Sequence, residues 1–193
     1  VFSASMDPGG LGAPLDGDTQ VDAERFADPG HFSLAPDQLN LAGGVRSGLQ
    51  TRITAFVFDA AAHPVDEGTL LRFRTTGGGI EQSARTGAGG LAVVTLVTAK
   101  PVPADGWAVV TAEAPGKGGG TVTAQTRVLF SGATAITLID PVPFLITPGQ
   151  DQLLRFSISD ASGHPLVAGT TITVSTIGGT VVGQNRFVMP DTQ

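Results

Sequence analysis

The acidic residues near the start of the chain are the first candidates for chemistry. In the stretch PLDGDTQVDAERF, the side chains of Asp16, Asp18, Asp22 and Glu24 supply closely spaced carboxylate oxygens. Hard cations such as Ca²⁺ prefer oxygen ligands of this kind. The stretch is therefore a candidate calcium site, and a solvated acidic linker is the alternative interpretation. We expect no required cofactor, and calcium is the one candidate ion.

Two histidines, His63 and His164, could act as metal ligands or general bases. They stand about a domain length apart in equivalent predicted turns, so we do not expect them to meet in one site. Ser162, His164 and Asp160 have the residue types of a catalytic triad, but they fall in a single short turn without a separate oxyanion hole. We therefore expect no catalytic residue.

Trp107 is the only tryptophan and follows the stretch PVPADG. With Pro101 and Pro103 it could form an aromatic shelf for a sugar or a peptide. The alternative is that its ring closes the end of a sandwich. The glycine-rich stretch APGKGGGT around Lys117 lacks the spacing of a phosphate-binding loop, so we expect a hairpin connection there.

The composition limits the fold classes that could position these residues. The chain has 27 Gly and 13 Pro in 193 residues, which favours a β protein over a helical one. No apolar run reaches the ~18 residues of a membrane span, and Val1 does not open a basic and apolar leader, so we expect a soluble chain, numbered from a mature terminus or cut from a longer protein. The absence of Cys excludes disulfides and thiolate chemistry.

The net charge of −6 is concentrated at the N-terminus. Residues 1–32 hold six acidic residues and one basic residue, whereas the remainder holds 11 acidic and 10 basic residues. Because no basic face exists, nucleic acid and anionic lipid are excluded as partners, and no direct insertion into a membrane is expected.

An internal repeat organises the chain. DAAAHPVDEGTLLRFRTTGGGI, which starts at Asp59, aligns without a gap on DASGHPLVAGTTITVSTIGGTV, which starts at Asp160, at an offset of 101 residues (160 − 59). The shared Asp, Pro and Gly residues are predicted to cap backbone donors, fix φ and allow positive φ in a turn. An offset of this size corresponds to about one small domain.

Alternating apolar residues predict the strands on either side of the repeated turn. In the first copy the expected core positions are Ile53, Ala55, Val57, Leu71, Phe73, Ala92, Val94, Leu96, Ala108, Val110, Ala112, Val128 and Phe130. These positions give about seven short strands in about 100 residues, the spacing of an immunoglobulin-like sandwich. The fold class we predict is all-β, with tandem immunoglobulin-like β-sandwiches and an irregular acidic N-terminal arm.

The order of these positions resembles the bacterial Ig-like domains of the invasin and intimin type. The pattern consists of Asp59, Pro64, Gly68 and Phe73, then Gly90, Ala92, Val94, Leu96 and Thr98, then Val110, Ala112, Val128 and Phe130. It covers about residues 45–131 and the start of a second copy over about residues 150–182. The resemblance implies an extracellular or surface-attached protein in which such domains follow one another as rigid stalks. His63 and His164 depart from it, since the family usually has Asn or a similar turn residue there.

The second copy is incomplete, because nothing after Asp160 corresponds to the last strands of the first copy. Half a sandwich would leave Leu154, Phe156, Ile158, Ile172 and Val174 uncovered, at ~1.5–3 kcal/mol for each large side chain. Either the chain continues beyond Gln193 or strands of another subunit complete the sandwich by β-strand addition.

Phe56 and Phe58 are predicted to face outward on one strand, where the second copy has Ser157 and Ser159. Such a pair indicates a surface that another segment covers. We expect the N-terminal arm to cover this surface with its apolar residues Phe2, Met6, Leu11, Leu15 and Phe26. A subunit interface is the alternative.

We expect an acidic arm over residues 1–32, a sandwich over 33–132 and an incomplete second sandwich over 133–193, joined by the short linker SGAT. The function we expect is a non-catalytic structural or adhesion module of a bacterial surface or secreted protein that acts as a stalk. One alternative is a filament subunit assembled by strand addition, with a homo-oligomer formed through the second sandwich. The other is a carbohydrate-binding accessory module of a secreted enzyme. The partners expected are other protein domains or subunits.

Overall fold

The computed structural model describes residues 25–140 and 146–192. Its first unit is a sandwich of strands in which buried and exposed side chains alternate. Its strands are β1 (Phe32–Pro36), β2 (Asn40–Leu41), β3 (Gln50–Val57), β4 (Leu70–Thr75), β5 (Gly79–Ile80), β6 (Ser83–Arg85), β7 (Leu91–Val97), β8 (Trp107–Pro115) and β9 (Thr121–Phe130). They form a four-stranded sheet in the order β1-β3-β7-β5 and a five-stranded sheet in the order β2-β9-β8-β4-β6. All pairs are antiparallel except β2 with β9.

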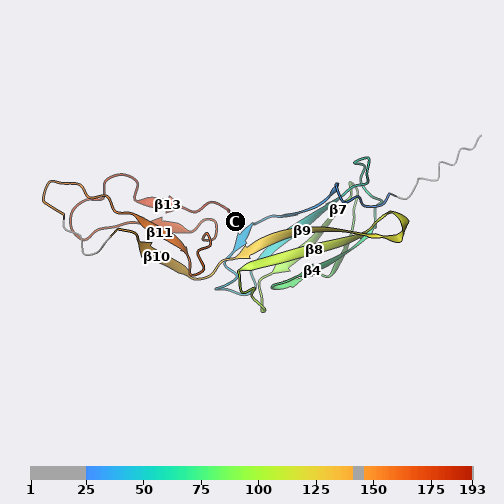
Figure 1. Cartoon of the computed structure of the whole chain (residues 1–193), viewed down its shortest axis with the longest axis horizontal. Helices are drawn as coiled ribbons and strands as arrows, with labels where there is room; N and C mark the ends of the chain where they lie inside the picture. Colours follow the sequence, from blue (N-terminus) through green and yellow to red (C-terminus); the bar gives the residue numbers. More distant parts are fainter. Residues whose placement is uncertain (1–24, 141–145, 193) are drawn as a thin grey trace, which may run out of the picture.

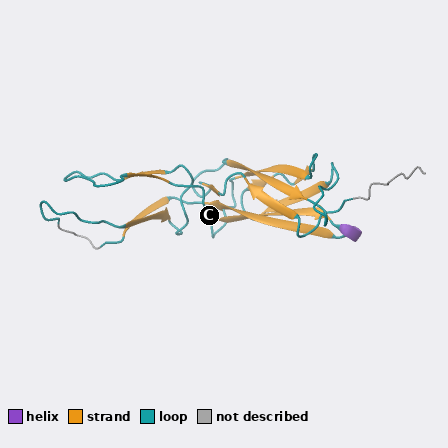
Figure 2. Ribbon diagram, turned by 90° about the horizontal axis from the view of Figure 1, so that it is seen from above, coloured by secondary structure: helices purple, strands orange, loops and turns teal. Residues whose placement is uncertain are grey.

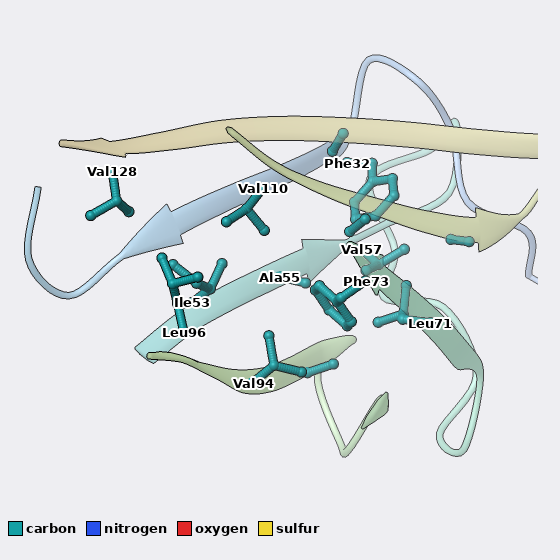
Figure 3. Packing of buried hydrophobic residues seen from close by; sticks show 14 of the residues in the cluster. Phe32, Ile53, Ala55, Val57, Leu71, Phe73, Val94, Leu96, Val110 and Val128 are labelled. Carbon is teal, nitrogen blue, oxygen red and sulfur yellow. The ribbon is translucent and has the colours of Figure 1, made fainter. Parts of the chain in front are cut away.

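The core lies between these two sheets. All the core positions predicted for the first copy are buried, at 5% exposure or less. Figure 3 shows Ile53, Ala55 and Val57 of β3 pointing at residues of the opposite sheet such as Val110 and Val128. The period of two in strand side chains places every second residue here, so the sequence alternation predicted this face correctly.

The second unit contains two separate two-stranded sheets. One joins β10 (Thr134–Leu138) with β11 (Phe156–Asp160), and the other joins β12 (Thr171–Thr173) with β13 (Arg186–Val188). Only Asp160 and Leu166 are buried among its described residues. The predicted apolar face is accordingly uncovered: Leu154 is exposed, and Phe156, Ile158, Ile172 and Val174 are half-buried.

The two units follow one another along the long axis of the molecule (Figure 1). The described residues include no α-helix, only the short 3₁₀ turn η1 (Lys117–Gly119) in the predicted β8–β9 hairpin connection. Within that part of the chain no helix has the length and apolar character needed to cross a bilayer. The all-β fold class is confirmed by this strand content and by the two-layer sandwich of the first unit.

Candidate functional site at the junction of the two units

The turn after β3 has the hydrogen bonds predicted for the repeat. The Oδ1 atom of Asp59 accepts the backbone N–H groups of Ala61 and His63, each at 2.9 Å. The backbone N–H of Asp59 donates to the carbonyl oxygen of His63 at 2.8 Å. His63 stands in the solvent with 63% of its side chain exposed, and its Nδ1 lies 3.5 Å from Asp59 Oδ2. The first turn is therefore a self-contained surface structure.

The turn after β11 repeats this arrangement with one added bond. Asp160 Oδ1 accepts the N–H groups of Ser162 and His164, each at 2.8 Å, and its backbone N–H donates to the His164 carbonyl at 2.8 Å. Asp160 Oδ2 lies 3.2 Å from His164 Nδ1 and also accepts the backbone N–H of Gly132 at 2.9 Å. The Asp160 side chain is only 4% exposed. This carboxylate therefore joins the turn of the second unit to the linker.

The environment of Asp160 favours its charged form. Burial alone would raise the pKa of this carboxyl group, but hydrogen bonds from the backbone N–H groups of Gly132, His164 and Ser162, and from the His164 ring, outweigh that effect. Its pKa therefore lies below the ordinary value of 3.8. The pKa of Asp59 is also lowered, chiefly by the N–H of His63. Both carboxylates are ionised at neutral pH, and that of Asp160 is a buried hydrogen-bond acceptor.

The linker itself is bonded to both units. Ser131 is buried, and its backbone N–H donates to the carbonyl oxygen of Leu41 at 2.9 Å. The carbonyl oxygen of Ser131 accepts the N–H of Gly44 at 3.0 Å. Because Gly132 is bonded to Asp160 and β10 begins at Thr134, hardly any residue is left to act as a hinge.

An aromatic contact crosses the junction. The rings of Trp107 and His164 meet edge to face, with centroids 5.8 Å apart and planes at 76°. The Arg127 guanidinium lies over the Trp107 ring, 4.3 Å from its centroid. Gly106 precedes Trp107 with φ of +78°, and a Cβ atom added to it would lie 3.0 Å from the His164 ring. The close approach of His164 to this loop therefore requires glycine.

Two buried leucines, Leu129 and Leu166, lie outside the main core cluster. Leu129 lies between Val128 and Phe130 on β9, so it points out of the first sandwich, yet its exposure is 0%. Leu166 of the second unit is 3% exposed. Neither belongs to the core cluster between the two sheets. Leu129 lies beside Gly106 at the junction. Burial of side chains of this size contributes about 1.5–3 kcal/mol each.

Two further hydrogen bonds join the second unit to Leu39 and Asn40 of the first. The Nδ2 of buried Asn40 donates to the carbonyl oxygen of Pro165 at 2.9 Å. The backbone N–H of Leu39 donates to Asp191 Oδ2 at 3.1 Å, which brings the last described residues back to the first unit. Figure 1 shows the end of the described chain at this place between the units. These contacts add to those of Asp160 and His164 at the junction.

The calcium candidate lies outside the described residues, since Asp16, Asp18, Asp22 and Glu24 all precede residue 25. It stays a prediction. Among the residues that the structure does describe, no group of three or more His, Asp or Glu side chains is placed to hold a metal ion. His63 and His164 belong to separate turns, each paired with its own aspartate.

Phe56 on the outer side of β3 is half-buried, and so is Phe58, which follows the end of that strand. Phe56 lies opposite Ser33 of β1 and Leu91 of β7. The backbone of Phe58 bonds to the segment before β1, because its carbonyl accepts the N–H of Asp28 at 3.0 Å and its N–H donates to the carbonyl of His31 at 3.1 Å. Four of the residues expected to cover this surface lie outside the described part of the chain: Phe2, Met6, Leu11 and Leu15.

Sequence reasoning named the linker, and it named Trp107, Asp160 and His164 for other reasons. It missed Leu129 and Asn40. One signal for Leu129 was present: VLF continues the apolar residues of β9 onto its outward side, where alternation predicts a polar residue.

Comparisons with known proteins give structural similarities alone, since no family model and no curated protein matches the chain. The solved D00-D0 domain of intimin matches 58% of this chain and 50% of its own, with 24% identity and a TM-score of 0.39. The adhesin InvE of Yersinia pseudotuberculosis matches over 86% of this chain and 49% of its own, with 16% identity and a TM-score of 0.42. A C-terminal intimin fragment, solved in complex with the intimin-binding domain of its translocated receptor, matches over 81% and 54%, with 17% identity and a TM-score of 0.43.

These proteins are of the type that the sequence pattern resembles. The chain spans about half the length of each of them. The three TM-scores are below 0.5, so the strand order and the core are what define the fold.

Proposed function

We propose that this chain is a non-catalytic stalk module of a bacterial surface or secreted protein, built from an acidic arm and two units that divide near residue 132. It holds neighbouring parts of the protein at a fixed spacing and orientation. The surface location follows from the sequence resemblance to the invasin and intimin type of Ig-like domain.

The observation that carries this proposal is the bonded junction. A flexible connection would leave the linker solvated, whereas here Ser131 is bonded to the first unit and Gly132 to the second. The buried Leu129, the contact between Trp107 and His164, and the bond from Asn40 to Pro165 add to these contacts between the units. Few free linker residues and a packed interface give limited hinge motion.

The histidines support a structural role. Each of the three contacts an aspartate close by in sequence: His31 with Asp28, His63 with Asp59 and His164 with Asp160. These pairs stabilise turns and lie in separate places, so they do not assemble the nucleophile, base and oxyanion donors that hydrolytic catalysis needs.

A distance measurement between the units tests the stalk. Because the chain has no Cys, spin labels can be placed at Thr123→Cys on β9 and Ser175→Cys after β12, both exposed. Pulsed electron resonance should give one narrow distance distribution. The combined change Asp160→Asn and Asn40→Ala should broaden it, whereas Asp59→Asn, in the equivalent turn without a linker contact, should leave it narrow. A broad distribution in the unmodified junction would refute a rigid stalk.

The surface location has its own test. Protease treatment of intact cells of the source organism should remove the chain, as detected with an antibody raised against it. Protection in intact cells together with cleavage after lysis would contradict this location.

A further inference from the structure

The outward side of the five-stranded sheet in the first unit is rich in arginine. Side chains alternate between core and solvent along each strand, so the exposed positions of β4, β6 and β9 project from this side. Its arginines are Arg72, Arg74, Arg85 and Arg127, and all are exposed. Glu113 of β8 is the one acidic residue at the outward strand positions of this sheet. This surface, called here the arginine face, therefore carries a net positive charge in a chain whose net charge is −6.

Neighbouring acidic residues compensate the arginine face only in part. The Nε of Arg74 lies 3.4 Å from Glu113 Oε1, and 67% of the Arg74 side chain is exposed. The Nη1 of Arg85 donates to the carbonyl oxygen of Gly68 at 2.6 Å, which leaves the charge of this arginine without a counter-charge. Among the described residues, no ion pair includes Arg72 or Arg85. The face can therefore accept further carboxylates.

The outward side of the other sheet differs. Its strand positions hold one charged residue, Arg52, whose Nε lies 2.8 Å from Asp37 Oδ2. The near neutrality of the sequence after residue 32 predicted that no basic face exists. That prediction is wrong for the five-stranded sheet, because β4, β6, β8 and β9 are separated along the chain and become neighbours only in the fold.

The described chain begins beside the arginine face. The backbone N–H of Arg25 donates to Asp66 Oδ2 at 3.2 Å. The same turn carries Gly68, whose carbonyl oxygen binds Arg85, and the carbonyl oxygen of Asp66 accepts the hydroxyl of Thr86 at 2.7 Å. Figure 2 shows this end of the first unit, where the described chain begins close to the turn η1 between β8 and β9. The N-terminal arm therefore meets the sandwich at the Arg85 edge of the face.

Residues 1–24 have the charge and the length to cover this face. They contain no Lys or Arg and five acidic residues, which are Asp7, Asp16, Asp18, Asp22 and Glu24. An extended segment of this length spans up to about 80 Å, whereas the nine residues of β8 span about 30 Å. Arg72 and Arg74 are two positions apart on β4, or about 7 Å, and the carboxylates of Asp16 and Asp18 have the same spacing in an extended segment.

We propose that residues 1–24 dock on the arginine face of their own chain, with their carboxylates paired to Arg72, Arg74 and Arg85. Each exposed ion pair is weak. Because the arm is tethered beside the face, its effective concentration there is high, and several weak pairs are enough to hold it. This location differs from the sequence prediction, in which apolar arm residues cover Phe56 on the opposite sheet. The docked arm closes the arginine face to other acidic partners.

Paramagnetic broadening from a spin label on the arm tests the contact. Because the chain has no Cys, Thr19→Cys attaches a single label between the acidic pairs of the arm. A chelator is present, since calcium on the arm would neutralise the same carboxylates. The label should broaden the amide signals of β4 and β6 at least about threefold more than those of β1 and β7, because stacked sheets lie about 10 Å apart. Raising the salt from about 0.1 M to about 1 M should remove most of this broadening, because the Debye length falls from about 10 Å to about 3 Å.

Matched variants separate charge pairing from other causes of broadening. The double change Arg72→Glu and Arg74→Glu should abolish the broadening of β4 and β6. Arg52→Glu is the control, because this arginine is equally exposed, at 69%, on the other sheet, and the change should leave the broadening as it was. Replacing the five acidic residues of the arm by Asn or Gln should also abolish it, and this variant leaves the residues of the sandwich unchanged.

Three results would overturn the proposal. Broadening of Phe56 and Leu91 in place of β4 and β6 would mean that the arm covers the outer side of β3. Absence of broadening on both sheets, or broadening that survives the double arginine change, would mean that the arginines do not hold the arm. A mixture of isotope-labelled chains without spin label and spin-labelled chains without isotope tests a second copy. Broadening as strong in this mixture as in the single labelled chain would assign the face to the arm of another molecule.

Discussion

Replacing Asp160 by Asn should destabilise the second unit much more than the same change at Asp59. An asparagine can keep one oxygen facing the N–H groups of Ser162 and His164, but its amide nitrogen then faces the N–H of Gly132, which loses its acceptor. Loss of one hydrogen bond to a charged group costs about 1.5–3 kcal/mol. Since about 1.4 kcal/mol is a factor of ten, the population of the detached junction should rise between about tenfold and a hundredfold.

Urea titration followed by amide NMR signals provides the assay, because it reports the two units separately. With a slope of about 1–3 kcal/mol per molar urea, the midpoint of the second unit should fall by about 1 M in Asp160→Asn. The midpoint of the first unit should stay unchanged. Asp59→Asn should shift neither midpoint appreciably, since its second oxygen faces only the exposed His63 ring at 3.5 Å. Equal effects of the two substitutions would refute the role of the Gly132 bond.

Three further outcomes follow from the junction. Gly106→Ala should broaden the distance distribution between the units, because its added Cβ meets His164, whereas Gly89→Ala, with a similar φ of +85° and open space around it, should not. The pKa of Asp160 in the folded chain lies below the ordinary 3.8, so the stability that its carboxylate contributes is complete above about pH 3.8 and is lost as the pH falls through the lowered value. Acid titration followed by Trp107 fluorescence should show this step. If the step persists in Asp160→Asn, the assignment to Asp160 is contradicted. Trp107→Ala should broaden the distance distribution and leave retention on polysaccharide columns unchanged, since Arg127 already lies over the ring; reduced retention would favour the carbohydrate-binding alternative.

The sequence predicted the sandwich well because strand alternation is a local property. Ile53, Ala55 and Val57 share a face whatever the rest of the chain does, so their burial could be expected from spacing alone. The aspartate turns were equally predictable, since Asp59 and Asp160 cap donors within a few residues of themselves. These features need no knowledge of distant contacts.

The junction could not be predicted in the same way, because its contacts join residues far apart in sequence. Asn40 meets Pro165 and Leu39 meets Asp191 only after both units have folded and docked. The repeat even suggested that Asp59 and Asp160 were equivalent, whereas the structure distinguishes them by one bond to Gly132 and by burial. A local sequence pattern specifies each turn. Whether a turn becomes part of an interface depends on where it lies relative to the other unit.

The most direct test of the stalk is the relative orientation of the two units in solution. Residual dipolar couplings, measured for backbone amides of β3, β8 and β9 and separately for those of β10 and β11, each define an alignment tensor. A rigid junction predicts tensors of equal magnitude and common orientation in the frame of the structure. A clearly smaller tensor for the second unit would mean that it swings freely about the linker, and the chain could not act as a stiff spacer.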